Sequence, residues 1–354
     1  MLKTIARGLA GLLLAGAIVF ALFAHQGAGW RWLISGGWHS SARIAALTPE
    51  EQTWAAIDFS GKPVKNGWSV RDMARLMLAL RLTAEREPQY SEYLDKIILR
   101  WNFCPVIDGE GELWSSSLQN GQPVVREELR LGESEYAATA FQLWGFSPEK
   151  AFTPPAHHVI IAQRRLAVDA RDPRTTWQPS LITTLPYMLP GLEFGWEPEG
   201  VAADRQKHLR KQAENVWLSQ KSRWETDKIL TARADFSLPQ APWHIQDTVW
   251  GNGYAWNSVG DDGRDYTRFA QVSTKAVFAL WALWDTPYTD VLMAVTKHLN
   301  DPQKGWYEGR QEATGDTNAA LTLSTNATVL EALFFKHNAG PLFDARRAKK
   351  ESYF

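Results

Sequence analysis

The sequence is short of the residue types that several classes of protein require. Its 354 residues include one cysteine, Cys104, which excludes an internal disulfide framework, a CxxC redox motif and a cysteine-rich zinc site. Acidic and basic residues are balanced, with 38 Lys and Arg against 39 Asp and Glu. Since no basic excess is available to neutralise phosphates, the composition argues against a nucleic-acid partner.

Cofactor and metal motifs are missing as well. The chain has neither GxGxxG nor GxxxxGK[ST], the glycine-rich patterns that bind nucleotides. His157, His158 and His244 are too few and too badly spaced for a metal site. The aspartates at 261, 262 and 265 lack EF-hand spacing. We therefore expect neither a cofactor nor a bound metal.

The N-terminus carries a long run without charge. Lys3 and Arg7 precede residues 8–24, which contain no charged side chain. Such a helix spans roughly 25 Å, close to the bilayer core, and its basic flank is expected in the cytoplasm. Residues 1–25 are therefore predicted to be a signal anchor in the inner membrane, with a cleaved signal peptide as the alternative. Either reading places the rest of the chain, after a linker over 26–46, in the periplasm.

Helical periodicity dominates the remaining sequence. Ser69 is expected to cap a helix whose apolar stripe is Val70, Met73, Met77 and Leu80. Further helices are predicted over 90–101, 133–144, 204–227, 267–284, 287–299 and 326–337. Residues 181–192 contain two prolines and are expected to be irregular or a kinked helix. Strand signals are sparse and confined to 124–131 and 247–254. The pattern predicts an all-α fold.

Three loop-rich segments, residues 131–146, 185–198 and 305–336, combine carboxylates with aromatic residues and glycines. Glu308 lies beside Trp306 and Tyr307, which are suited to stacking on a sugar ring. Glu193 has apolar neighbours, which raise a carboxyl pKa as a general acid requires. Structural alternatives exist: Glu135 favours a helix N-terminus, and Asp72 and Asn326 are suited to helix caps. Paired carboxylates are the groups that glycoside cleavage needs.

Residues 132–146, 189–195 and 305–336 together resemble a bacterial domain family of uncharacterised function found in envelope and exopolysaccharide gene clusters. The resemblance covers roughly 47–340, and its most specific part is Gly-Trp-Tyr-Glu-Gly at 305–309 with the segment that follows. It implies an (α/α) toroid, of the kind used by many glycan hydrolases and lyases, as a single domain over 47–341 before a basic tail at 342–354. One departure is Gly67-Trp68-Ser69-Val70-Arg71-Asp72, where members have Thr-Thr-x-Trp-Asp. The family's patterned positions carried over are Asp72, Glu135, Glu193, Trp306, Tyr307, Glu308, Asn318 and Asn326.

These observations predict a membrane-tethered, glycan-active protein of exopolysaccharide synthesis or export that hydrolyses glycosidic bonds. Glu308 and Glu193 are the expected carboxylate pair, with Glu135 and Asp72 as substitutes. The expected substrate-binding residues are Trp306, Tyr307, Tyr136, Glu312, Asn318 and Asn326.

Two other functions stay open. The first is a non-catalytic accessory subunit that binds polysaccharide or docks on a membrane glycosyltransferase or export protein. The second is a polysaccharide lyase, with Tyr136, Tyr254 or Tyr307 as base. The lyase ranks last because uronic substrates call for a basic cleft, and no loop in the sequence is strongly basic.

Overall fold

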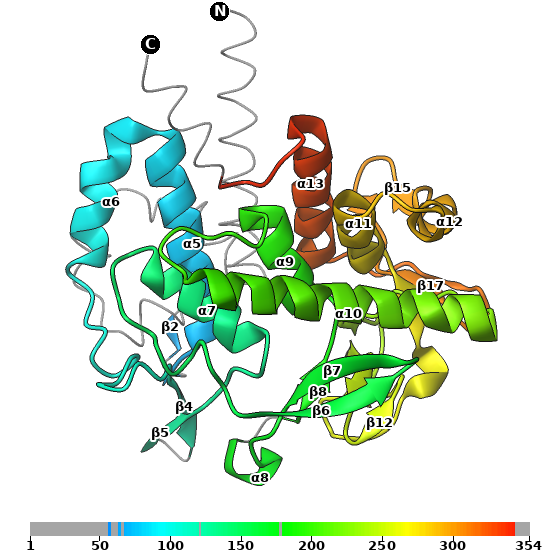
Figure 1. Cartoon of the computed structure of the whole chain (residues 1–354), viewed down its shortest axis with the longest axis horizontal. Coiled ribbons are helices and arrows are strands. Elements are labelled where there is room, and N and C mark those ends of the chain that lie inside the picture. The colour runs from blue at the N-terminus through cyan, green and yellow to red at the C-terminus, as the bar shows by residue number, and fades with distance from the viewer. Residues whose placement is uncertain (1–55, 58–62, 65–66, 120–121, 177–178, 344–354) are drawn as a thin grey trace, which may run out of the picture. The chain divides into compact units, whose positions relative to one another are not determined.

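The computed structural model describes residues 56–57, 63–64, 67–119, 122–176 and 179–343 (Figure 1). These residues form two compact units, which are described separately. The expected N-terminal membrane segment (1–25), the linker (26–46) and most of the basic tail lie outside the described residues. Among the helices that are described, none is long and apolar enough to cross a membrane.

The first unit contains residues up to Leu129, then 133–154 and 174–178. Helix α5 starts as the sequence predicts, because Ser69 Oγ accepts a hydrogen bond from the Asp72 amide at 3.2 Å. Its residues Val70, Met73 and Met77 are buried, and α5 packs against α7. The α-helices of this unit are α5 (Val70–Arg86), α6 (Ser91–Ile98) and α7 (Glu133–Gln142), and its strands are β1 (Ala56–Ile57), β2 (Pro63–Val64), β3 (Gly67–Trp68), β4 (Ser115–Gln119) and β5 (Gln122–Arg126). Helix α8 (Pro173–Thr176) lies at a boundary between the units.

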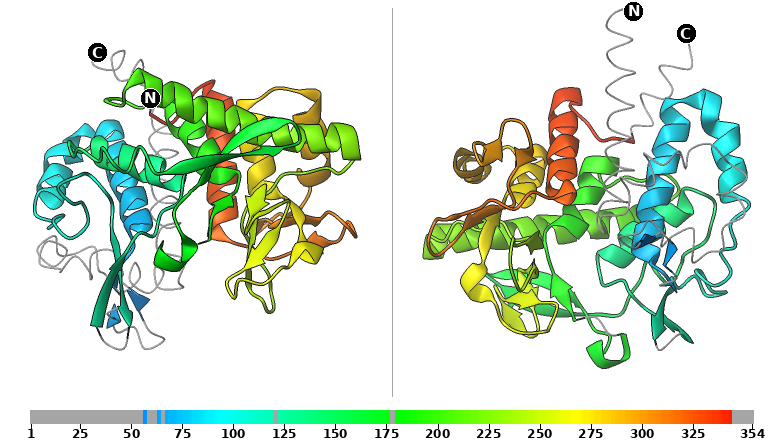
Figure 2. Two further views of the ribbon diagram at one scale, coloured as in Figure 1. Left: turned by 60° about the horizontal axis from the view of Figure 1, so that its bottom comes forward. Right: turned by 180° about the vertical axis from the view of Figure 1, so that it is seen from behind.

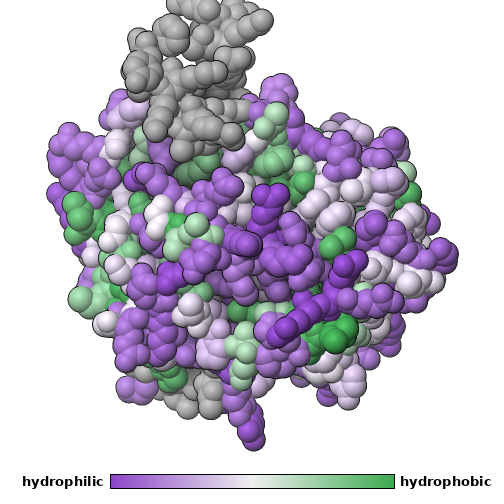
Figure 3. All heavy atoms as spheres, in the orientation of Figure 1, coloured by the Kyte–Doolittle hydropathy of each residue, from purple (hydrophilic) through white to green (hydrophobic). Residues whose placement is uncertain are grey.

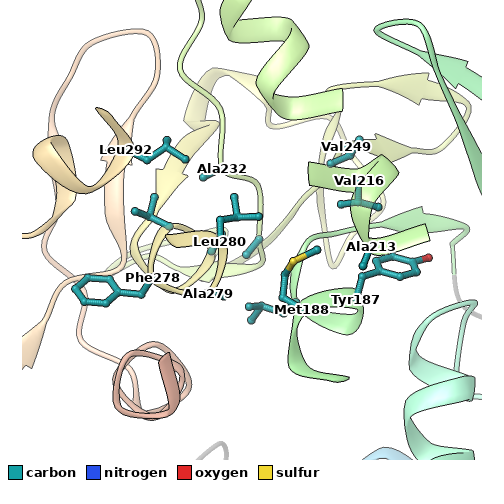
Figure 4. Packing of buried hydrophobic residues seen from close by; sticks show 14 of the residues in the cluster. Tyr187, Met188, Ala213, Val216, Ala232, Val249, Phe278, Ala279, Leu280 and Leu292 are labelled. Atoms are coloured by element: carbon teal, nitrogen blue, oxygen red, sulfur yellow. The ribbon is translucent and has the colours of Figure 1, made fainter. Parts of the chain in front are cut away.

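The second unit holds the other helices around one apolar core. Met188, Val216, Phe278, Leu280 and Leu292 belong to this core, which Figure 4 shows from close by. Its side chains come from all five helices and from β6 and β7, and α13 packs along α11. The helices are α9 (Leu185–Phe194), α10 (Ala203–Asp227), α11 (Thr274–Leu283), α12 (Pro287–Thr296) and α13 (Leu323–Asn338).

Small antiparallel sheets occupy the loops of the second unit. Their hydrogen-bonded orders are β6-β7, β12-β11-β8, β13-β10-β9, β14-β17-β18 and β15-β16. The strands are β6 (Ala156–Ile161), β7 (Arg164–Asp169), β8 (Leu181–Ile182), β9 (Phe236–Ser237), β10 (His244–Asp247), β11 (Trp250–Gly251), β12 (Tyr254–Ala255), β13 (Ser258–Gly260), β14 (Gln271–Ser273), β15 (Asn300–Asp301), β16 (Gly305–Trp306), β17 (Gly309–Gln311) and β18 (Thr317–Asn318).

The all-α expectation is therefore wrong, since sheets accompany the helices in both described units. Most of the strands are two to five residues long, too short to show an alternating pattern in the sequence. The predicted helix over 267–284 illustrates this. Its residues Gln271–Ser273 pair with β17 instead, so α11 begins at Thr274. Residues 181–192 combine a strand with α9, which contains Pro190.

The N-termini of two helices of the second unit, α9 and α11, contact the backbone of residues 231–235. The Thr184 amide, at the start of α9, donates to the Arg233 carbonyl at 3.1 Å, and the Ser273 amide before α11 donates to the Ala232 carbonyl at 2.9 Å. The Thr274 amide reaches the Glu308 carbonyl at 3.0 Å. The side chain of Glu308 in turn binds the first turn of α13. This end of the helices is consequently a natural place for negative charge.

Helix α10 lies beside the β6–β7 hairpin and binds the backbone of β7 through its side chains (Figures 1 and 2). The buried amide of Gln212 accepts from the Ala167 amide at 3.2 Å and donates to the Ala167 carbonyl at 2.9 Å. Asn215 Nδ2 donates to the Arg165 carbonyl at 2.9 Å. These side chains bind the backbone of β7 much as a third strand would.

Replacement of Gln212 by alanine should lower the free energy of unfolding by about 2–3 kcal/mol, because both buried backbone groups of Ala167 lose their partner. Chemical denaturation measures this change. Lys207→Ala, at an exposed position of the same helix, is the matched control and should change stability by less than about 0.5 kcal/mol. Equal effects of the two substitutions would contradict this account of α10.

Candidate functional site

Glu308 is a buried carboxyl between β16 and β17. The hydroxyl of Thr322 donates to Oε1, and the hydroxyl of Thr325 donates to Oε2 at 3.0 Å. Thr322 is also the N-cap of α13, since its Oγ1 accepts from the Thr325 amide at 3.2 Å. Burial raises the pKa of Glu308, although Lys275 and the Thr322 hydroxyl act against this rise.

Lys275 joins this region to a carboxylate at the surface. It lies in the first turn of α11 with its side chain almost fully buried, and its Nζ is 2.8 Å from Asp235 Oδ2 and 3.4 Å from Ser324 Oγ. Desolvation opposes ionisation of Asp235, but Lys275 and His244 together hold the pKa of this carboxyl well below its usual range. The Asp235 side chain is 31% exposed, so an ionised carboxylate is presented to solvent.

His244 lies between two aspartates. Its Nε2 is 3.7 Å from Asp235 Oδ2, and its Nδ1 is 3.1 Å from Asp261 Oδ1. Desolvation lowers the pKa of His244, yet the two carboxylates outweigh it and raise that pKa above its ordinary value. The preceding residue, Trp243, is 63% exposed in the left-handed region with φ of 66°. The β9–β10 hairpin therefore presents an indole one residue away from an imidazole that contacts Asp235.

A second network of charged side chains, formed by Arg223, Arg233, Asp247 and Glu312, is closed in the sense that each carboxylate is bound by arginine. The buried guanidinium of Arg233 binds Asp247 Oδ1 and, at 2.8 Å, Glu312 Oε2. Arg223 Nη1 is 3.3 Å from the same oxygen of Glu312. Asp247 also accepts from Ser258 Oγ at 2.8 Å and from the Gln271 amide at 3.0 Å. Burial, opposed by Arg233, raises the pKa of Asp247 to about 6. The predicted substrate ligand Glu312 is thus engaged by two arginines.

The two predicted asparagines have internal partners. Asn318 Nδ2 donates to the Ser237 carbonyl at 2.9 Å and to Gln271 Oε1 at 3.2 Å, which fixes β18 beside the β9–β10 hairpin. Asn326 is not the helix cap expected from sequence, because α13 begins three residues earlier at Leu323.

The Asn326 amide holds the backbone of the strand that precedes Glu308. Its Oδ1 accepts from the Trp306 amide at 2.8 Å, and its Nδ2 donates to the Trp306 carbonyl at 3.0 Å. Gly305 has a φ of 107°, and a Cβ there would lie 2.2 Å from Asn326 Oδ1. The Trp306 ring packs edge-on against Phe278 with centroids 5.6 Å apart. Tyr307, half-buried, donates its backbone amide to the Leu299 carbonyl.

The structure does not bring Glu193 and Glu308 together. The Glu193 carbonyl accepts from the Phe343 amide at 2.8 Å, beyond the C-terminal end of α13. The Glu308 side chain binds the N-terminal end of the same helix. A helix of 16 residues is about 24 Å long, whereas a catalytic pair lies roughly 5–9.5 Å apart. Another partner for Glu308 is needed if this carboxyl takes part in catalysis.

The other predicted residues belong to the first unit. Asp72 lies in the first turn of α5, where its backbone amide is capped by Ser69. Glu135 and Tyr136 lie in the first turn of α7 and are both buried. All three therefore lie in the first turn of a helix, and the cap of α5 is Ser69 rather than Asp72.

Sequence reasoning missed the group that the fold assembles around the partly exposed Asp235: Asp235, His244 and Lys275. These residues are spread over 40 positions, so no local motif contains them. A signal was present in Lys275, which is the one charged residue between 270 and 284 and is followed by an apolar run over 276–284. Within the described ranges, no cluster of three or more His, Cys, Asp or Glu is arranged to hold a metal ion.

Comparison with known protein families shows to which family the chain belongs. The model of the DUF3131 family, described as a protein of unknown function, matches residues 47–339. The chain belongs to this family. The resemblance to a family of uncharacterised function is thereby confirmed. No curated protein matches the sequence.

One solved structure from Bacteroides caccae, described as a "putative glucoamylase", is similar to this chain in fold. The TM-score is 0.52 at 10% sequence identity, and the match covers 93% of this chain and 82% of the other. At this identity, the likeness shows the fold alone.

The contacts of His244 predict its titration. In an NMR titration, its imidazole should titrate above pH 6.5, whereas His158, whose pKa is lowered by desolvation and by neighbouring positive groups, should titrate below. Since the folded pKa of His244 is raised, its contribution to stability is complete below the unfolded pKa and is lost as pH rises through the folded pKa.

The variant Asp235→Asn should lower the pKa of His244, while Asp265→Asn, at an exposed aspartate without a contact to His244, should leave it unchanged. An imidazole of His244 that titrates at or below 6.5 in the wild-type protein would show that the two aspartates do not hold it.

Proposed function

We propose that this protein is glycan-active: it binds a polysaccharide over the β9–β10 hairpin and hydrolyses a glycosidic bond beside Asp235. The observation that carries the proposal is an ionised carboxylate at the surface, close in the hairpin to an exposed tryptophan. The fold likeness to the protein described as a "putative glucoamylase" supports the same class of ligand.

The hairpin offers the groups that a sugar needs. The exposed indole of Trp243 presents a flat apolar face suited to the apolar face of a pyranose ring. Asp235 accepts hydrogen bonds from sugar hydroxyls, and His244 supplies a polar edge beside it. In this proposal Trp243, rather than the core-packed Trp306, is the stacking platform.

The two carboxyls near Lys275 are suited to different roles. Asp235, whose pKa is held low, is assigned the role of base or nucleophile, and Glu308, whose pKa is raised by burial, is assigned the role of acid. Among the charged groups near them, Lys275 has the largest effect on the pKa of both Asp235 and Glu308. Because Thr322 and Thr325 enclose Glu308, proton transfer to a sugar oxygen requires the first turn of α13 to open.

The cellular setting belongs to the proposal as well. The basic flank and uncharged run at residues 1–24 are typical of exported chains, which supports a periplasmic protein of exopolysaccharide synthesis or export. A membrane glycosyltransferase or export protein is the partner expected in that setting.

A second function is supported by the closed network of charges. Asp247 and Glu312 are both bound by arginine, and Glu308 is enclosed, as in a protein that binds glycan without cutting it. This alternative is the accessory subunit of a membrane glycan synthase or export complex.

The assay of new reducing ends from a panel of bacterial exopolysaccharides separates these functions. Asp235→Asn and Glu308→Gln should each lower kcat by at least about 100-fold. Wild-type activity should fall on the acidic side as Asp235 protonates and on the basic side as Glu308 ionises. Asp285→Asn, at an exposed site in the same unit, is the matched control and should keep full activity.

Cleavage at the wild-type rate by both variants would rule out these two carboxyls. A polymer that retards the protein in an affinity gel without being cleaved would instead support the accessory-subunit function.

The stacking role of Trp243 gives a separate expectation. Trp243→Ala should weaken binding of the retained polymer at least about tenfold, as expected for loss of a central aromatic contact, with no measurable loss of stability because the indole is exposed. Tyr254→Ala removes another exposed aromatic ring, 71% accessible on the β11–β12 hairpin, and should bind normally. Equal weakening by both would contradict a specific platform at Trp243.

A further inference from the structure

Positive groups gather on the β6–β7 hairpin and the first half of α10. Residues 156–169 and 203–214 contain six Lys and Arg and three carboxylates, Asp169, Asp204 and Glu214, of which Asp169 is buried. In the fold these segments lie side by side, because Gln212 and Asn215 bind the backbone of β7. Figure 3 shows the face over α10 and this hairpin as mostly hydrophilic. The surface is therefore basic although neither segment alone is a strongly basic loop.

The centre of this surface has no carboxylate partner. Arg165 is exposed, and its Nη2 lies 3.2 Å from His158 Nδ1. The charged groups that act on His158 are Arg165, His208 and His157, all of which lower its pKa. Within the described residues, Arg165 forms no ion pair with an acidic side chain. Other exposed basic side chains among the described residues do have such a partner, such as Lys96 with Glu92.

The edge of the surface is only partly neutralised. Arg210 Nε and Lys211 Nζ each lie 3.5 Å from an oxygen of the single carboxylate Glu214. Ile160 pairs with Arg165 across the hairpin and is 79% exposed. An apolar contact thus lies next to a guanidinium whose planar fork suits a carboxylate.

We infer that this basic surface, formed by His157, His158, Arg165, His208 and Lys211, binds a polysaccharide that carries carboxylates, such as a uronic acid polymer. The inference rests on the proposed function, which gives a polysaccharide as the ligand. It adds that this polysaccharide is negatively charged. Arg165 binds a uronate carboxylate, and Ile160 contacts the apolar face of a sugar ring. A nucleic acid fits less well, because the whole chain has a net charge of -1 and so no basic excess to neutralise a phosphate backbone.

The test is electrophoresis of the full chain in native gels that contain polygalacturonate or, as the neutral polymer, dextran. Polygalacturonate should retard the wild-type protein more than dextran does, and 1 M NaCl in a matched binding assay should abolish the difference because the Debye length falls to about 3 Å. Arg165→Gln should weaken binding about tenfold in Kd, as expected for loss of a charge-assisted contact.

Two variants control for charge and fold. Lys96→Gln removes the same unit charge from an exposed site and should bind like the wild type, and Arg165→Lys should recover part of the affinity. Equal retardation of wild type and Arg165→Gln, or no retardation of the wild type by polygalacturonate, would overturn the inference. Arg165-dependent binding to phosphatidylglycerol vesicles, without binding to polygalacturonate, would also overturn it in favour of a membrane surface.

The outcome is separable from that of the proposed function. Asp285→Asn, at an exposed site outside both the basic surface and the β9–β10 hairpin, should still be retarded by polygalacturonate. If no polymer yields reducing ends but Arg165-dependent retardation persists, hydrolysis fails and the basic surface stands. If reducing ends appear and retardation does not depend on Arg165, the reverse holds.

Discussion

The buried guanidinium of Arg233 is the interaction on which the rest of the second unit depends. It binds Asp247 of β10 and Glu312 of the loop after β17, while its carbonyl accepts from the first residue before α9. One residue therefore links the start of α9, through its carbonyl, to two small sheets, through its guanidinium. A buried ion pair adds little stability compared with apolar packing, but an unpaired buried charge is costly. The network consequently specifies one arrangement of these loops rather than adding to their strength.

This fixed frame determines which groups reach the surface. The segment that carries Arg233 continues directly to Asp235, so Asp235 emerges where Lys275 and His244 can bind it. Asp247 is buried and Asp235 is partly exposed, and their pKa values move in opposite directions. Burial dominates at Asp247, whereas a lysine and an imidazole dominate at Asp235.

The sequence predicted the long helices well because each contains several turns of periodic apolar residues. The starts of α5 and α7 and both ends of α10 lie within about a residue of expectation. Strands of two or three residues carry no such pattern, and the all-α expectation failed there. The segment around Glu308 was recognised as dense in polar and aromatic residues, but its partners were not. Glu193 lies at the far end of α13, and Lys275 comes from an apolar stretch, so the pairing depended on tertiary structure that local patterns do not contain.

The close approach of Gly305 to Asn326 has a consequence for how this sequence can diverge. The asparagine side chain occupies the space where a Cβ of residue 305 would stand, and the same amide holds both backbone groups of Trp306. A side chain at 305 would push the amide away, and a shorter side chain at 326 would leave the strand before Glu308 without its partner. A substitution at either position alone is therefore expected to destabilise this segment. Positions 305 and 326 are therefore expected to change together in evolution, as a pair of covarying sites.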